Sequence, residues 1–123
     1  MKNNRVEYVS RVPVKSVPSN LPAGFSAGKI PATSVYTLEH VGPYQHLGNA
    51  WSTLYNMQQS KEIPVNKKIH PFETYHNNPS DVSANELITR VHFPLTYKLY
   101  WNITSIRRFC NLPSSVLLSP IGF

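Results

Sequence analysis

The sequence contains a single cysteine, Cys110, so no disulfide can form within the chain. A lone cysteine fits a reducing compartment, and we expect a cytoplasmic protein. The longest apolar run falls far short of the roughly 20 residues that a membrane-spanning helix needs, and no apolar stretch follows the polar first residues. These absences exclude a disulfide scaffold, and we expect neither a membrane span nor a secretion signal.

Metal ligands are equally sparse. The five histidines are scattered along the chain, and neither they nor Cys110 show the paired spacing of a zinc site. We therefore expect no metal and no other cofactor. Cys110 also lacks a neighbouring acid–base pattern, so a catalytic thiol is not expected.

Charged residues make up only 15% of the chain, and the net charge is +6. Residues 96–123 carry Lys98, Arg107 and Arg108 without any acid, and so contribute half of that charge. A basic chain can attract nucleic acid or anionic lipid. No recognition helix or RNA-binding motif accompanies the charge, so neither nucleic acid nor a membrane is the expected partner.

The chain of 123 residues is long enough for one compact domain, and its 41% hydrophobic content can build a core. Runs rich in β-branched and aromatic residues predict strands, with Pro13 placing the first at a sheet edge or ending it. The predicted strands cover residues 5–17, 25–30, 33–40, 71–76 and 86–95. Strand, helix, strand and strand follow one another over residues 33–95. This order indicates an α+β fold, with a helix packed on an antiparallel sheet.

The clearest helix is predicted over about residues 44–59, directly after the Gly42-Pro43 turn. Six residues at helical spacing form one stripe along it: Leu47, Ala50, Trp51, Leu54, Tyr55 and Gln58. An aromatic stripe of this kind usually belongs to the core. Core packing and ligand contact therefore both remain open for Trp51 and Tyr55.

Residues 96–123 are predicted to form a C-terminal extension to a module that covers residues 1–95. Apolar and aromatic residues are frequent in the extension, while Pro113 and Pro120 interrupt its second half. Its periodicity does not decide between a further helix, a strand and a segment that covers an exposed face.

Residues 25–95 carry a series of short motifs in a fixed order. They are His40-Val41-Gly42-Pro43-Tyr44, Leu47, Ala50-Trp51, Leu54-Tyr55, Phe72-Glu73-x-Tyr75, Asn77-Asn78-Pro79, Glu86-Leu87 and Phe93-Pro94-Leu95. Together these motifs resemble the gyrase-inhibitor-like domain family. That family includes the effector-binding domains of multidrug-responsive bacterial transcription activators, such as AraC-type regulators.

The resemblance implies two strand–helix–strand–strand modules joined in one curved sheet, with a cleft that binds lipophilic, often cationic, small molecules. A glutamate on the strand after the helix commonly pairs with the charge of the ligand, and Glu73 occupies that position. This chain matches the second module only, has no helix-turn-helix domain, and carries Asn77-Asn78-Pro79 where the family usually has Asn-Asp-Pro. A homodimer could restore the missing module, and the extension could instead fold back over the uncovered face.

The physical chemistry of Glu73 is compatible with such a site. A carboxylate between Phe72 and Tyr75, expected on a central strand, would lie in partly apolar surroundings and need a partner. A lysine or arginine of the chain, water or a cationic ligand could serve, and aromatic faces would add to the attraction of a cation. The predicted ligand-binding residues are Glu73, Trp51, Tyr55, Tyr75, Tyr44, Tyr36 and Phe93.

The leading prediction is a non-enzymatic module that binds lipophilic, cationic small molecules. One alternative is a hydrolase of the same fold with Glu73 as general base. The other is a gyrase-directed inhibitor that acts through protein interaction.

Overall fold

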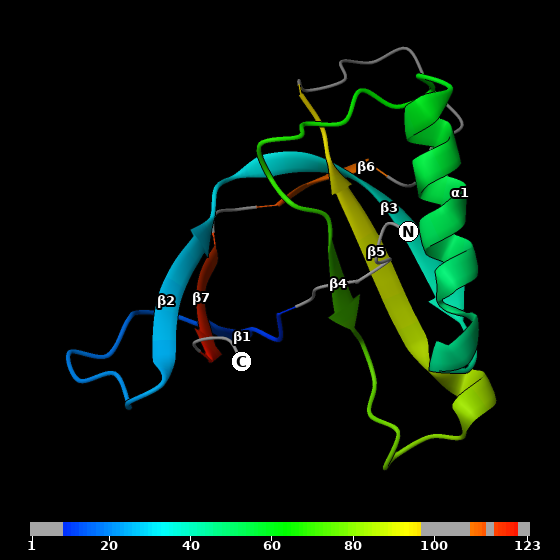
Figure 1. The fold of residues 1–123 in the computed structure, drawn as a ribbon. Helices are drawn as coiled ribbons and strands as arrows, with labels where there is room; N and C mark the ends of the chain where they lie inside the picture. The colour runs from blue at the N-terminus through cyan, green and yellow to red at the C-terminus, as the bar shows by residue number, and fades with distance from the viewer. Residues whose placement is uncertain (1–8, 97–108, 113–114, 121–123) are drawn as a thin grey trace, which may run out of the picture. The chain divides into compact units, whose positions relative to one another are not determined.

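The computed structural model describes residues 9–96, 109–112 and 115–120, which belong to two compact units (Figure 1). The described part of the first unit is an antiparallel sheet of three strands: β1 (Val12–Val14), β2 (Phe25–Ile30) and β7 (Ser115–Pro120). Strand β7 lies between the other two. Pro13 is thus in an edge strand, as predicted, where its missing N–H is tolerated.

The second unit consists of an antiparallel sheet and one α-helix, which confirms the predicted α+β fold. Its elements are β3 (Thr33–Val41), the 3₁₀-helix η1 (Tyr44–His46), α1 (Gly48–Gln59), β4 (Phe72–Tyr75), the 3₁₀-helix η2 (Ala84–Glu86), β5 (Ile88–Pro94) and β6 (Phe109–Leu112). The strand order is β4-β5-β3-β6. Strands β3 and β5 pair along most of their length, and α1 packs against both of them.

The position of β4 differs from the expectation for Glu73. Within the described residues β4 pairs with β5 alone, so Glu73 lies on an edge strand and not on a central one. Strand order depends on pairing between distant segments, which local hydrophobic patterns do not specify.

Two segments of the C-terminal extension form strands in the described structure. Strand β6 pairs with β3, from Thr33 opposite Leu112 to Tyr36 opposite Phe109. Strand β7 pairs with β1 and β2. Residues 97–108 of the extension lie outside the described residues, as does the start of the predicted strand 5–17.

The core of the second unit lies between α1 and one face of the sheet. Alternation along the strands directs every second side chain to this face, and the stripe of α1 supplies the opposite wall. Leu87, Thr89, Val91 and Phe93 alternate along the chain and are all buried. The remaining buried members are Tyr36, Leu47, Ala50, Leu54, Ile63 and Leu95. No helix among the described residues is long and apolar enough to cross a membrane.

The C-terminus of α1 ends in a left-handed residue that is not glycine. Lys61 has a φ of 61°. Its N–H donates to the carbonyl of Gln58 at 3.2 Å, and that of Glu62 donates to the carbonyl of Met57 at 2.9 Å. These two bonds form a Schellman motif, in which the left-handed position usually holds glycine because a side chain is strained there.

Replacing Lys61 with glycine should therefore stabilise the second unit. We expect the free energy of unfolding to rise by about 0.5–1 kcal/mol, since relief of the left-handed strain exceeds the extra flexibility of glycine in the unfolded chain. Urea denaturation followed by circular dichroism measures the change. Lys61→Ala is the control, because it removes the same charge and keeps the strain; equal stability of the two variants would contradict the explanation.

Candidate functional site

The carboxylate of Glu73 is held by two aromatic side chains. The indole N–H of Trp51 donates to Oε1, and the hydroxyl of Tyr75 donates to Oε2 at 2.6 Å. Both donors are neutral, and no lysine or arginine of the described ranges forms an ion pair with this carboxylate. Glu73 is half-buried. Among the described residues, this carboxylate is therefore hydrogen-bonded but has no cationic partner.

The local folding of β4 and α1 explains why these three side chains meet. Glu73 and Tyr75 are two residues apart on one strand, so their side chains share a face of the sheet. Trp51 belongs to the stripe that α1 turns toward that face. The predicted stripe contributes Leu47, Ala50 and Leu54 to the core, while Trp51 also reaches Glu73.

Aromatic rings extend from both sides of this carboxylate. On the Oε1 side, Trp51 stacks on Tyr55 with ring centroids 5.9 Å apart, and both rings contact Phe93 at 5.6 and 5.1 Å. On the Oε2 side, Tyr75 meets Tyr44 edge to face at 5.6 Å. Such offset and edge-to-face pairs are favourable ring geometries. We call Glu73 and these five aromatic residues the Glu73 site.

The aromatic rings of the Glu73 site differ in their exposure to solvent. Phe93 is fully buried, whereas Tyr44, Tyr55 and Tyr75 are 39%, 48% and 60% exposed. Exposure of three large amphipathic rings around one carboxylate leaves apolar surface available to another molecule.

The structure brings together six of the seven predicted ligand-binding residues. The seventh, Tyr36, is only 5% exposed and lies in the core, directly opposite Phe93 in the β3–β5 pairing. It belongs to the same core cluster as Phe93.

Two of the sequence motifs build the turns that position this site. Gly42 has a φ of +134°, which side chains rarely tolerate, and its N–H donates to the carbonyl of Leu87 at 2.9 Å. His40 Nε2 lies 3.1 Å from the carbonyl oxygen of Pro43. Together they place Tyr44 at the start of η1, where its ring reaches Tyr75.

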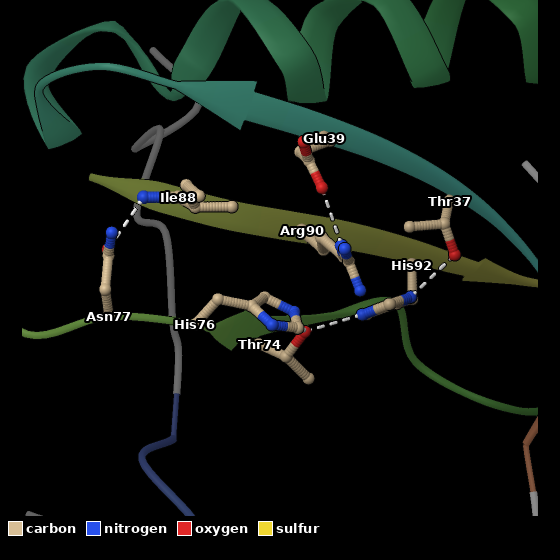
Figure 2. Close-up of polar contacts among 8 residues, drawn as sticks. All are labelled: Thr37, Glu39, Thr74, His76, Asn77, Ile88, Arg90 and His92. Atoms are coloured by element: carbon tan, nitrogen blue, oxygen red, sulfur yellow. Dashed lines mark hydrogen bonds and ion pairs between the residues drawn. The ribbon is translucent and has the colours of Figure 1, made fainter. Parts of the chain in front are cut away.

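Asn77 ties the end of β4 to the start of β5. Its amide group donates to the carbonyl of Glu86 at 2.8 Å, and its carbonyl accepts the N–H of Ile88 at 2.8 Å. Figure 2 shows the second of these bonds. The Asn77-Asn78-Pro79 motif therefore has a structural role, since it closes the loop that connects the two strands.

The face of the sheet away from α1 carries a buried histidine that the sequence did not single out (Figure 2). His92 is 5% exposed, and its Nδ1 and Nε2 lie 2.8 Å from the hydroxyls of Thr37 and Thr74. Nearby, the exposed Arg90 pairs with Glu39 at 2.8 Å. Burial, followed by the positive charges of Arg90 and His76, lowers the pKa of His92 to about 4.

This pKa predicts a loss of stability in acid. The unfolded chain takes up a proton on His92 near pH 6.5, while the folded protein resists protonation until about pH 4. The unfolded state binds more protons between these values, so the free energy of unfolding falls as the pH is lowered, by at most about 3 kcal/mol from this group.

Denaturation of wild type and His92→Gln between pH 7 and 4 measures the effect, because the variant retains all carboxylates and loses only this contribution. His46→Gln, which removes an exposed histidine of η1 outside the surroundings of His92, should behave as wild type. If wild type and His92→Gln lose stability equally, His92 does not resist protonation in the fold.

The described residues offer no site for a metal ion, because none of their histidine, cysteine, aspartate and glutamate side chains gather in groups of three or more.

One buried hydroxyl does lack a partner within the same residues. It belongs to Thr89, which lies opposite Tyr75 in the β4–β5 pairing and is fully buried. Sequence patterns alone could not indicate it, since threonine is common in buried strands.

Comparison with known proteins points to one family. Residues 2–96 match the GyrI-like small molecule binding domain. Searches of curated proteins and of solved structures found no match. The matched segment includes every residue of the Glu73 site and covers well over half of the chain. This chain therefore belongs to the GyrI-like small molecule binding domain family.

Proposed function

We propose that this chain binds lipophilic, cationic small molecules at the Glu73 site, as a binding module and not as an enzyme. Membership of the family supports small-molecule binding in general. The observation that carries the finer proposal is the carboxylate of Glu73, which two neutral aromatic donors hold in place without neutralising its charge.

The charge of the ligand follows from electrostatics. A partly buried carboxylate is costly unless its lost hydration is replaced. The two hydrogen bonds replace part of that hydration, and each bond to a charged group contributes about 1.5–3 kcal/mol. A cation beside Glu73 would supply the missing charge partner, and a neighbouring ring face would add about 0.5–2 kcal/mol.

The lipophilic character follows from the exposed rings. Tyr55 on one side of the carboxylate and Tyr44 and Tyr75 on the other present aromatic surface to solvent. A flat apolar ligand that covers these rings would release water from both partners. A small hydrophilic cation would gain only the electrostatic part. The hydrolase and gyrase-inhibitor alternatives rest on the resemblance alone, and we propose neither.

Glu73→Gln should weaken the binding of thioflavin T, a lipophilic cationic dye, about ten-fold or more. Glutamine is nearly isosteric and keeps an oxygen acceptor for Trp51, but it removes the charge. Dye fluorescence measures affinity, and circular dichroism checks the fold. Glu62→Gln removes an exposed carboxylate outside the site and serves as the matched control. Equal affinity of the Glu73 and Glu62 variants would remove Glu73 from this role.

We also propose that two copies of the chain assemble as a homodimer. The described residues contain one strand–helix–strand–strand module, β3-α1-β4-β5, whereas the resemblance implies two modules in one sheet. Within the described sheet β4 is an edge strand, and an edge presents unpaired backbone groups to a second strand.

Light scattering should give twice the chain mass of 14.0 kDa at high micromolar concentration. The apparent mass should fall on dilution if association is reversible, because dimerisation depends on concentration. A constant mass of 14.0 kDa across the concentration series would disprove the dimer.

A further inference from the structure

Strand β4, which carries Glu73, is short. It has four residues, and within the described sheet it pairs with β5 alone. A short edge strand opens more readily than a central one. An additional restraint on β4 would therefore affect the position of Glu73 directly.

That restraint comes from the face of the sheet that lies away from α1. The ring of Phe72 stacks on the ring of His92, with centroids 4.9 Å apart and planes at 29°. The hydroxyl of Thr74 lies 2.8 Å from His92 Nε2. Phe72 and Thr74 are the two chain neighbours of Glu73, and strand alternation turns both away from the face that carries the carboxylate.

His92 is itself fixed to a third strand. Its Nδ1 lies 2.8 Å from the hydroxyl of Thr37 on β3, while its backbone belongs to β5 (Figure 2). The ring thus links β3, β5 and β4 on one face, and the adjacent Phe93 contacts Trp51 and Tyr55 on the other.

We propose that His92 is a positioning residue for the Glu73 site: it holds both neighbours of Glu73 from the opposite face and so fixes the carboxylate against Trp51. This inference rests on the proposed function for its consequence, which is a higher affinity for cationic ligands. Positioning of this kind matters because a displacement of about 0.5 Å is enough to weaken a built site.

The protonation state of His92 suits this role. A neutral imidazole has one donor and one acceptor nitrogen, and the two threonine hydroxyls can complement either tautomer. The charged groups facing the ring are Arg90 from β5, with its partner Glu39 on β3, and His76 just beyond β4, whose Nε2 lies 3.4 Å from the Thr74 hydroxyl. Burial, followed by the positive charge of Arg90, disfavours a second proton on the ring, so both hydrogen bonds persist at neutral pH.

Two isosteric variants separate positioning from stability. Thr74→Val removes the hydroxyl that links His92 to β4, and Thr37→Val removes the hydroxyl that links it to β3. Each leaves one ring nitrogen of His92 without its hydroxyl partner, so we expect similar losses of unfolding free energy. Only Thr74→Val releases the strand that carries Glu73.

The first readout is the indole N–H signal of Trp51 in a proton–nitrogen NMR spectrum. The chain has two tryptophans, Trp51 and Trp101, and Trp51→Phe identifies which signal belongs to Trp51. In Thr74→Val this signal should move toward its position in Glu73→Gln, whereas in Thr37→Val it should stay near wild type. Identical shifts in the two threonine variants would overturn the proposal.

The second readout is the affinity for thioflavin T under conditions where both variants are fully folded. We expect about five-fold weaker binding for Thr74→Val and a change within about two-fold for Thr37→Val. His92→Gln, whose amide can reach the Thr74 hydroxyl, should retain more affinity than His92→Asn, which is too short to do so. Equal losses in both pairs would show a purely structural role.

The two proposals fail in different ways. If wild type does not bind the dye, or if Glu73→Gln binds it equally well, the proposed function is wrong, and the Trp51 signal still tests the positioning of Glu73. If wild type binds through Glu73 but Thr74→Val changes neither affinity nor the Trp51 signal, His92 does not position the site.

Discussion

The structure of the site depends on one carboxylate that is hydrogen-bonded but has no cationic partner in the part of the chain that the structure describes. Trp51 and Tyr75 each donate to one oxygen of Glu73, and neither brings a positive charge. Such donors orient the carboxylate while leaving its attraction for a cation intact. In the proposed function, the exposed tyrosines favour apolar cations over hydrophilic ones, because only an apolar ligand would also cover the rings.

The two faces of the sheet support the Glu73 site through different contacts. On one face, α1 and the core present Trp51, Tyr55 and Phe93 as a packed aromatic support. On the other face, His92 joins three strands through two threonine hydroxyls and a stacked phenylalanine. Strand β4 is an edge strand of the described sheet and has one face toward each of these two groups of residues. Both groups therefore contribute to the position of Glu73.

Local sequence patterns predicted much of this arrangement. Helical spacing placed Trp51 and Tyr55 on one stripe, and the β-branched and aromatic residues of 71–76 predicted the strand that carries Glu73 and Tyr75. The patterns could not reveal that β4 is an edge strand or that Tyr36 lies in the core, because both depend on which strands pair. The contacts of His92 could not be predicted for the same reason, because its contact with Thr37 joins positions 55 residues apart. A single histidine in an apolar strand also carries no local sequence signal.

The most direct test of the account is an NMR titration of the wild-type protein with thioflavin T, following the indole N–H signals of Trp51 and Trp101. The account predicts that the Trp51 signal moves and saturates with the same dissociation constant that dye fluorescence reports, because the cation binds the carboxylate to which this indole donates. If fluorescence saturates while the Trp51 signal stays in place, the dye binds elsewhere and Glu73 is not its receptor.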